Sequence, residues 1–584
     1  MRSYRLLFPS FRKGLIPLSL GIFLLLSVDF LQLLIPRFIK GAIDDLTTQG
    51  TLASGMVRYL LLILGTALVI FGLRMIWRRL IFGQARRIEA ALRCRLFDHL
   101  LRLSPTYYQR ATIGDLMAHA TNDIEAVRMA LGMGLVSLVD SLILGSAAIA
   151  FMAYINLKLT LISLWPIPLV SFLTQRLSKK LHLRFDSVQA TFSQIMEKVR
   201  ESLVGIVVVK AYCLQEREED RLARLSLQYE DQNIRLARIM GTLFPLSLLM
   251  TNLSLAVVLW LGGRQVLAKE ITAGDFVAFI SYLGLLAWPV MALGWVINLI
   301  KRGAVSLERI ERILSEPPEI IDLPGLSGST PGGPHSLEIK ALTYTYGQGK
   351  EPVLRQVHLD ISSRKRYLIT GKTGSGKTTL AMLMVRLLEP PLGSLFVCGE
   401  EIHAIPLARL RKMVSLVPQD PFLFSDTIRA NLLFARPEAG EENLWEALKV
   451  AAFEEEIRAF PEGLDTVVGE KGVLLSGGQK QRLCLARALL ENPPMLILDN
   501  TLSAVDLNTE RKIQEALSAF RQDRTTIFIS HRLIGLEGVE TIYLLDEGAL
   551  IESGSHEQLL RLRGSYYRLY QVQCLEMELR QGNF

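Results

Sequence analysis

The run Gly371-Lys372-Thr373-Gly374-Ser375-Gly376-Lys377-Thr378 lies between an apolar β-type segment, residues 367–370, and a helix-patterned segment that begins at Thr379. Glycines in such a turn let consecutive backbone N–H groups point at one spot at the start of a helix. That arrangement binds phosphate; Lys377 can reach the outer phosphates, and the Thr378 hydroxyl can ligate Mg²⁺. The run therefore predicts a phosphate-binding loop, and its flanking segments disfavour the alternative of a plain glycine-rich turn.

Short β-type runs alternate with helical runs through the rest of the second half of the chain, at residues 413–417, 495–499 and 525–530. This alternation predicts an α/β domain with a largely parallel sheet. The second run, Leu496-Ile497-Leu498-Asp499, is an apolar strand that ends in an acid, which is the form of a segment whose Asp holds Mg²⁺. Together with the loop, it predicts a nucleotide-binding domain.

The first half of the chain is dominated by apolar stretches, and half of all 584 residues are hydrophobic. A helix of about 20 apolar residues crosses a bilayer. Six stretches meet this requirement, approximately at residues 14–36, 57–77, 131–155, 157–177, 243–266 and 276–300. We therefore predict an α-helical membrane domain with two long cytosolic loops over residues 1–314. A linker rich in Pro, Gly and Ser over 315–334 and a nucleotide-binding domain over 335–584 follow it.

The formal charge of +8 raises nucleic-acid binding as an alternative. Many basic residues, such as Arg78, Arg79, Arg86 and Arg87, however, lie beside the apolar stretches, as in the cytoplasmic loops of membrane proteins. No nucleic-acid recognition module accompanies the charge, so we expect no nucleic-acid partner. The excess of basic residues beside the apolar stretches places the N-terminus and the second half of the chain in the cytosol. The five scattered cysteines predict free thiols in a reducing compartment.

Leu475-Ser476-Gly477-Gly478-Gln479 resembles the signature sequence of ABC transporters. Further segments resemble other motifs of that family, in the family's order. They are Tyr346 as the ring that stacks on adenine, Gln419 as the Q-loop glutamine, residues 466–472 as the exporter X-loop, residues 503–506 with Asp506 as the D-loop, and His531 as the switch histidine. The resemblance covers the whole chain, including spans fused ahead of one nucleotide domain.

This resemblance implies an ATP hydrolase coupled to transmembrane transport, with ATP and Mg²⁺ as cofactors. The ATP site would contain Tyr346, Gly371, residues 373–379 and, from a second chain, residues 476–479 and Asp506. Thr378, Gln419 and Asp499 would hold Mg²⁺. Gln419, Asn500 and His531 would take the catalytic positions. The protein is expected in the bacterial cytoplasmic (inner) membrane as a multi-pass protein.

Asn500 departs from the family pattern, in which the Asp is followed by a Glu that polarises the attacking water. An amide cannot accept a proton as a carboxylate does, so we expect a loss of about 10²–10⁴-fold in rate at this site. Family sites are shared between two chains, so a homodimer would carry two impaired sites and a heterodimer only one. We therefore favour a heterodimer with a second ABC half-transporter, similar to the degenerate-site subunit of Mdl-type bacterial multidrug exporters. A substitution engineered to trap ATP would also explain Asn500.

The cargo is expected to be an amphipathic drug-like molecule or a lipid. A homodimeric lipid flippase and a regulatory membrane protein that gates a partner without pumping remain alternatives. Residues 112–123 and 201–214 resemble the segments that couple the two domains of family exporters. Asp29 and Asp140 lie inside predicted spans, where an ionisable group is costly. Each could contact a cationic substrate, or pair with a polar neighbour for structure, which we favour slightly.

Overall fold

The computed structural model describes residues 8–49, 53–322, 335–347, 349, 351–469, 472, 474–533 and 538–580. The chain divides into two compact units. The first consists of Met1–Leu100 and Gly114–Ser315, and the second of Leu101–Ile113 and Glu316–Phe584. Residues 323–334 of the predicted linker lie outside the described part of the chain.

The described part of the first unit is helical. Its helices are α1 (Phe8–Gln49), α2 (Ala53–Arg102), α4 (Ile113–Ala118), α5 (Ile124–Met129), α6 (Leu135–Val139), α7 (Gly145–Ile155), α8 (Leu157–Leu164), α9 (Pro166–Val204), α10 (Ile206–Ala211), α11 (Gln215–Val257), α12 (Gly263–Leu267) and α13 (Ala273–Leu314). The π-helical turns η2 (His119–Asp123), η3 (Ala130–Gly134) and η4 (Asp140–Leu144) join α4 to α7, and η5 (Val258–Gly262) joins α11 to α12.

Three helices of the described residues are long and apolar enough to cross a bilayer: Gly14–Thr47, Gly55–Arg102 and Ile113–Ile155. They contain the first three predicted stretches. The fifth and sixth stretches overlap the shorter apolar helices Asn252–Leu267 and Ala273–Pro289. The fourth stretch includes residues 167–175, whose side chains lie outside the described part.

Local capping explains two of the chain reversals in this unit. The side chain of Asn156 accepts a hydrogen bond from the Leu159 N–H at 2.9 Å, so the chain stops after α7 and restarts as α8. Thr272 and Asp275 form a capping box at the start of α13. Such caps satisfy N–H groups that have no partner within the helix.

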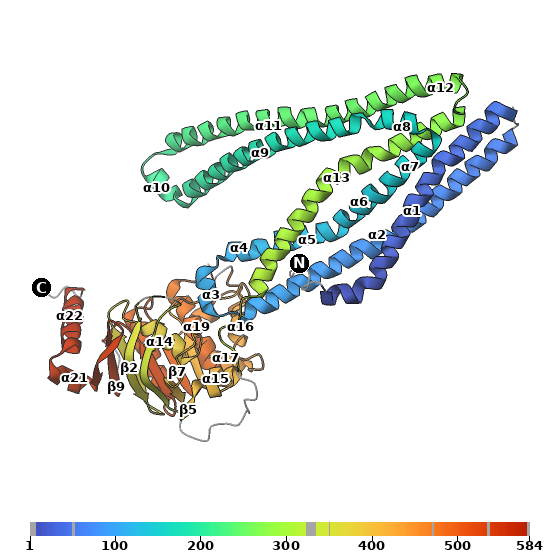
Figure 1. Ribbon diagram of the computed structural model, residues 1–584. Helices are drawn as coiled ribbons and strands as arrows, with labels where there is room; N and C mark the ends of the chain where they lie inside the picture. Colours follow the sequence, from blue (N-terminus) through green and yellow to red (C-terminus); the bar gives the residue numbers. More distant parts are fainter. Residues whose placement is uncertain are drawn as a thin grey trace. The chain divides into compact units, whose positions relative to one another are not determined.

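Two groups of helices stand out in the first unit, which contains the predicted membrane domain and is called the membrane unit below. α9 and α11 run side by side as a long hairpin with α10 at its tip (Figure 1). α1, α7 and α13 pack together around a buried core that includes Leu33, Met152 and Phe279. The Tyr282 hydroxyl donates to the Leu33 carbonyl at 2.9 Å and ties α13 to α1.

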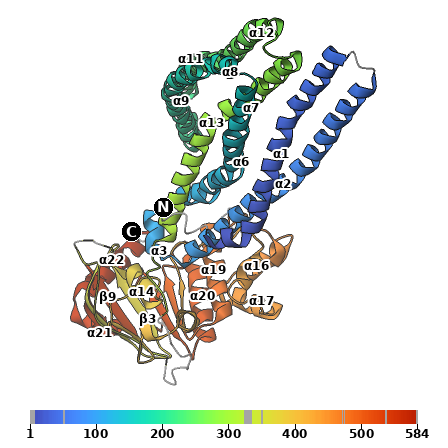
Figure 2. The same ribbon diagram turned by 45° about the vertical axis from the view of Figure 1, so that its right-hand side comes forward.

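The second unit contains two sheets (Figure 2). Its strands are β1 (Leu337–Tyr344), β2 (Leu354–Ile361), β3 (Arg366–Gly371), β4 (Leu395–Val397), β5 (Glu400–Glu401), β6 (Val414–Val417), β7 (Met495–Asp499), β8 (Thr525–Ile529), β9 (Thr541–Asp546) and β10 (Ala549–Gly554). Strands in the order β2-β1-β4-β5 form an antiparallel sheet. The order β10-β9-β3-β8-β7-β6 forms the second sheet, parallel except for β10.

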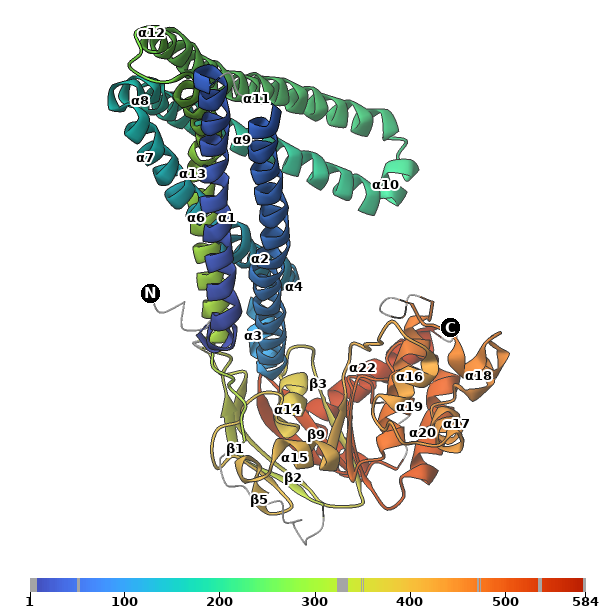
Figure 3. The same cartoon turned by 90° about the vertical axis from the view of Figure 1, so that its right-hand side faces the viewer.

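Helices flank the parallel sheet. They are α14 (Lys377–Met384), α15 (Leu407–Met413), α16 (Ile428–Leu433), α17 (Glu441–Val450), α18 (Glu454–Ala459), α19 (Gly477–Glu491), α20 (Leu507–Phe520), α21 (His556–Leu562) and α22 (Ser565–Arg580); α3 (Pro105–Arg110) also belongs to this unit. α16–α19 gather away from the antiparallel sheet (Figure 3). All residues of β7 and β8 are buried, as expected for central strands of a covered parallel sheet. The predicted α/β fold of this half is confirmed.

Candidate functional site: a nucleotide site at the carboxyl edge of the sheet

The glycine-rich loop connects the end of β3 to the start of α14. Gly374 and Gly376 have φ angles of +85° and +94°, in the left-handed region that favours glycine. At Gly371, an added Cβ would lie 2.0 Å from the Leu545 carbonyl oxygen, so no larger residue fits there. The predicted loop therefore has the geometry that its glycines imply, at the N-terminus of a helix of eight residues.

Lys377 is the first residue of α14, and its side chain folds over the loop. The amine donates to the carbonyl oxygens of Gly371 at 2.8 Å and Lys372 at 2.7 Å, and to the Ser375 hydroxyl at 3.2 Å. Burial lowers the pKa of this amine, and the negative charge of Asp499 opposes that shift. These bonds hold a cation at the centre of the loop, where phosphate oxygens would be attracted to it.

Asp499 ends β7 and is 1% exposed. Burial raises the pKa of its carboxyl, whereas a hydrogen bond from Thr378 and the charge of Lys377 lower it. One carboxylate oxygen, Oδ1, is buried without a hydrogen-bond partner. A buried carboxylate oxygen beside a Thr hydroxyl is a suitable ligand pair for Mg²⁺, whose other ligands are commonly water and nucleotide phosphates. The residues present therefore fit the ion.

Two further predicted site residues, Gln419 and Tyr346, come from other segments of the second unit. Gln419 is exposed and lies two residues after β6, the strand that pairs with β7 in parallel. The Tyr346 hydroxyl lies 3.0 Å from the Thr379 hydroxyl, so the ring is attached to the first turn of α14. The structure thus brings Tyr346 and Thr379 together beside the loop and leaves part of the ring exposed.

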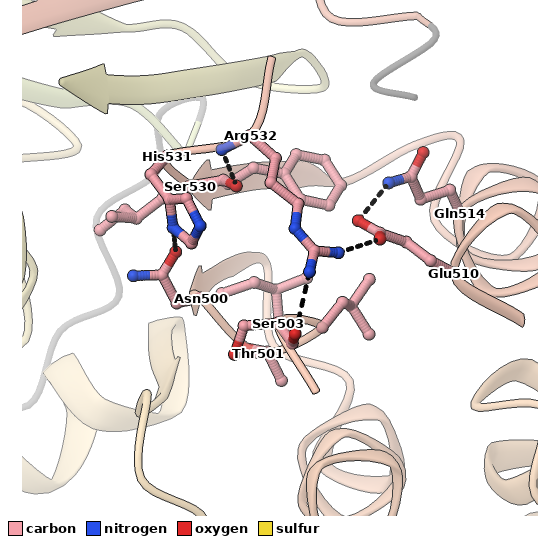
Figure 4. Close-up of a pocket in the computed structure, with 12 residues that line it drawn as sticks. Asn500, Thr501, Ser503, Glu510, Gln514, Ser530, His531 and Arg532 are labelled. Atoms are coloured by element: carbon pink, nitrogen blue, oxygen red, sulfur yellow. Dashed lines mark hydrogen bonds and ion pairs between the residues drawn. The ribbon is translucent and has the colours of Figure 1, made fainter. Parts of the chain in front are cut away.

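Asn500 and His531 follow the adjacent parallel strands β7 and β8, and their side chains meet (Figure 4). The His531 Nδ1 lies 3.3 Å from the Asn500 Oδ1. Burial lowers the pKa of His531, and the positive charges of Arg532 and Lys377 lower it further. These effects favour the neutral imidazole, which can donate one hydrogen bond. Asn500 itself has a φ of +47°, which Asn tolerates better than most residues.

Arg532 joins this pair to the D-loop, a contact that the sequence reasoning missed. Its guanidinium donates to the Glu510 carboxylate and to the Ser503 carbonyl oxygen, both at 3.0 Å (Figure 4). The only signal in the sequence was the position of Arg532 next to His531. Glu510 also accepts from Gln514 at 3.4 Å. Glu510 is thus engaged as a structural partner of Arg532.

Gln573 of α22 is a second residue that the motifs did not indicate. Its Nε2 donates to the His531 carbonyl oxygen at 2.5 Å, and its Oε1 accepts from the Leu533 N–H at 2.8 Å. The backbone on both sides of Arg532 is therefore fixed by one amide side chain. Nothing in the local sequence around His531 could have predicted a partner some 40 residues later.

The signature residues lie at the N-terminus of α19. Ser476 and Gln479 form a capping box, and the Gln479 Nε2 donates to Glu456 at 2.8 Å. Gly478 packs so closely against the D-loop that an added Cβ would lie 2.9 Å from the Ala504 carbonyl oxygen. None of these described contacts involves the phosphate loop, so the signature and the loop form separate parts of the domain.

Asp506 caps the next helix, α20, by accepting a hydrogen bond from the Thr509 N–H at 3.0 Å. In the segment predicted to be the X-loop, Val467 pairs with Thr427 in a single β-bridge. Glu470 and Lys471 of that segment lie outside the described residues. In the described chain, one edge of the sheet thus carries the glycine-rich loop together with Tyr346, Thr379, Asp499, Asn500 and His531. The signature residues and Asp506 lie around the D-loop instead.

The fold and this site define an ATPase domain preceded by a helical membrane domain. Residues 18–290 match the ABC transporter transmembrane region, and residues 354–503 match the ABC transporter family. The chain belongs to the ABC transporter family, as an exporter half-transporter that combines one membrane domain with one ATPase domain. The predicted coupling of ATP hydrolysis to transport is thereby confirmed at the level of the family.

Similar proteins match over nearly the whole chain. The chain is 34% identical to the probable multidrug resistance ABC transporter ATP-binding/permease protein YheI of Bacillus subtilis (strain 168), with 95% of each chain covered. It is 35% identical to the multidrug resistance-like ATP-binding protein MdlA of Escherichia coli (strain K12), with 95% and 94% covered. Other relatives are named ATP-dependent lipid A-core flippases. The structure of a bacterial Atm1-family ABC exporter with ATP bound superimposes with a TM-score of 0.77 at 26% identity, covering 96% and 99% of the two chains.

Proposed function

We propose that this protein is one subunit of a heterodimeric exporter that moves amphipathic compounds across the bacterial cytoplasmic membrane by alternating access. Its own ATP site binds nucleotide but hydrolyses it slowly, and most hydrolysis takes place at the site of the partner chain. The names of the relatives support a drug-like cargo. The basic residues beside the apolar helices support a cytosolic N-terminus and ATPase domain.

The observation that carries this proposal is the side chain next to Asp499. Asn500 lies at the edge of the sheet where a general base is needed, and its amide oxygen is within 3.3 Å of His531. The nearest other carboxylate in that pocket, Glu510, is held by Arg532 at 3.0 Å. The described pocket therefore has no carboxylate that is both unpaired and adjacent to Asp499, which supports a site that retains ATP without rapid hydrolysis.

In this proposal, each group at the site has a separate role. The loop N–H groups and Lys377 bind the phosphates, while Tyr346 stacks on the adenine. Thr378, Asp499 and Gln419 hold Mg²⁺, which supplies charge neutralisation of the phosphate oxygens when bound. When ATP is bound, His531 donates its one N–H to the terminal phosphate in place of the Asn500 oxygen. Ser476 to Gln479 and Asp506 act on the nucleotide of the partner chain.

The test compares ATP hydrolysis in lipid by the purified chain alone and by the chain co-purified with candidate half-transporters from the same cell. We expect hydrolysis only in the heteromeric sample. Rapid turnover by the chain alone would contradict the impaired site and the need for a partner.

A homodimeric lipid flippase is the second candidate, supported by the relatives named lipid A-core flippases. Transport of fluorescent lipids by the chain alone in vesicles, without transport of dyes, would favour it. ATP binding that opens a partner channel without uphill transport would instead favour the regulatory alternative.

A further inference from the structure

A cavity of about 560 Å³ lies within the membrane unit, between the C-terminal part of α13 and the segment formed by α4 and η2. Three cations of α13 line one wall, Lys301, Arg302 and Arg309. The acids of the opposite wall are Asp115 of α4 and Asp123 of η2. The cations outnumber the carboxylates, so the lining carries an excess of positive charge.

The two walls of this cavity are fixed to one another by protein contacts. The Ser306 hydroxyl of α13 donates to the Asp123 Oδ1 at 2.7 Å, and the Asp123 Oδ2 lies 2.6 Å from the His119 Nδ1. Gly303 lets α13 approach the chain after α5 so closely that an added Cβ would overlap the Ala130 side chain. The cavity is therefore preorganised, which lowers the cost of binding a ligand.

Two of the three cations remain available to a ligand. Asp123 is 8% exposed and its Oδ1 lies 3.7 Å from the Arg309 Nη1, so this acid offsets the charge of Arg309. Lys301 and Arg302 are exposed, and neither forms an ion pair with a described side chain. The free positive charge is thus concentrated at one end of the cavity.

That end of the cavity is expected at the level of lipid headgroups. Lys301 directly follows the sixth predicted apolar stretch, residues 276–300. At a rise of 1.5 Å per residue, Arg309 lies about 14 Å further along the helix. α13 ends at Leu314, and the ATPase unit continues from Glu316, so the cavity belongs to the end of the helix that leads to the ATPase.

We propose that this cavity binds the phosphate of an anionic phospholipid, with Lys301 and Arg302 donating to the phosphate oxygens. Basic pockets between membrane helices on the cytoplasmic side suit such headgroups. Asn122 and Asp115, which also line the cavity, offer polar partners to the hydroxyl groups of a glycerol headgroup. A choline headgroup would instead bring a cation into a cavity that already has excess positive charge. This inference goes beyond the proposed export function, because the lipid is a resident ligand and not the cargo.

The test measures equilibrium binding by the purified full-length protein in a neutral detergent, without ATP. Isothermal titration calorimetry compares dihexanoyl phosphatidylglycerol with dihexanoyl phosphatidylcholine, two soluble lipids that have the same chains. Because each Lys or Arg near a membrane surface contributes about fivefold to the affinity for an anionic lipid, we expect phosphatidylglycerol to bind roughly 30-fold more tightly. Equal affinities of the two lipids would overturn the inference without any mutation.

Variants assign the preference to the two free cations. Lys301→Gln and Arg302→Gln should each lower the affinity for phosphatidylglycerol about fivefold, and the double variant should remove the preference. Both side chains are exposed, so we expect these variants to fold. Arg312→Gln, on the same helix but outside the cavity lining, is the matched control and should keep the preference. A double variant with an unchanged preference would exclude Lys301 and Arg302 as the binding groups.

A third ligand, glycerophosphoglycerol, identifies the source of the phosphate because it is the same headgroup without chains. Binding as tight as that of phosphatidylglycerol would assign a soluble phosphate ester, whereas much weaker binding would assign a membrane lipid. Both results support a phosphate site at Lys301 and Arg302. If the preference is present but the protein drives no export, the proposed function fails and this site stands.

Discussion

At the scale of single residues, Asn500 fits both its backbone and its neighbour His531. It adopts a φ of +47°, which disfavours most side chains but suits Asn, and its amide oxygen approaches His531. The residue is thus compatible with the backbone and with the switch histidine. What it lacks is the capacity to accept a proton from water.

We expect Asn500→Glu to raise ATP hydrolysis at this chain's own site in the heteromeric complex about 100-fold or more, because it restores a carboxylate beside Asp499. The left-handed backbone should cost the variant about 1 kcal/mol of stability. Asn500→Gln carries a side chain of the same length without the charge and is the control. Its hydrolysis should stay at the level of the unmodified chain in a steady-state ATPase assay. An equal gain in both variants would disprove the role assigned to the carboxylate.

Asp499 gives a prediction for stability. Burial raises its pKa above the usual 3.8, so the ionised form destabilises the folded protein at neutral pH. The destabilisation by ionised Asp499 is absent below about pH 3.8, where the carboxyl is protonated in both the folded and the unfolded protein. It reaches its full size above the pKa of Asp499 in the folded protein. Asp499→Asn should therefore raise the thermal midpoint of the nucleotide-free protein at pH 7. Mg²⁺ with ATP should stabilise the unmodified protein more than the variant. A lower midpoint for the nucleotide-free variant would refute this account of Asp499.

At the scale of elements, α19 is joined to the D-loop by one buried side chain. The Gln481 Nε2 donates to the Ser503 hydroxyl at 3.1 Å, and its Oε1 accepts from the Ala504 N–H at 2.9 Å. Because Arg532 also binds the Ser503 carbonyl oxygen, the signature helix and the switch region share one loop. A displacement of either element is therefore transmitted to this loop.

Replacing Gln481 should destabilise this junction. Gln481→Ala leaves the Ala504 N–H without its acceptor, so we expect a loss of about 1–3 kcal/mol and a thermal midpoint lower by several degrees. The neighbouring half-buried Lys480 provides the control, and Lys480→Ala should change the midpoint by much less. Differential scanning fluorimetry of both variants without nucleotide makes the comparison. Equal midpoints would show that the two bonds do not stabilise the domain.

At the scale of the whole molecule, the α9–α11 hairpin ends in an apolar tip. Val207 of α10 is 75% exposed and Tyr212 is 74% exposed. Exposed apolar side chains on this tip are available for contact with another protein surface. The segment coincides with the predicted coupling segment at residues 201–214.

We expect Val207→Asp to abolish the stimulation of ATP hydrolysis by cargo, because it places a charge on the apolar tip. Nucleotide binding should be unchanged, because the tip is outside the ATPase unit. Leu227→Asp, at an exposed position of α11 away from the tip, is the control and should retain the stimulation. ATPase assays with and without a transported dye, combined with ATP-analogue binding, measure both properties. Retained stimulation in the Val207 variant would exclude the tip from coupling.

The sequence was sufficient for those features whose cause is local. The loop glycines have φ values that only glycine adopts readily, and Asn156 reverses the chain by capping its own helix, so both could be predicted from short segments. The contacts of Arg532 and Gln573 could not, because they join elements that are distant in sequence. It was equally unpredictable that one oxygen each of Asp29 and Asp140 remains without a donor, since helix packing alone determines this.

The two hydrogen bonds of Gln573 have a practical consequence for how the protein is produced. Helix α22 supports His531, the predicted switch histidine, through the backbone of residues 531 and 533. A chain truncated before α22, or a purification tag fused so closely that it unwinds this helix, would therefore alter enzyme kinetics as well as yield. Affinity tags are better placed after a long spacer, and activities of differently tagged preparations should be compared before any is used as a reference.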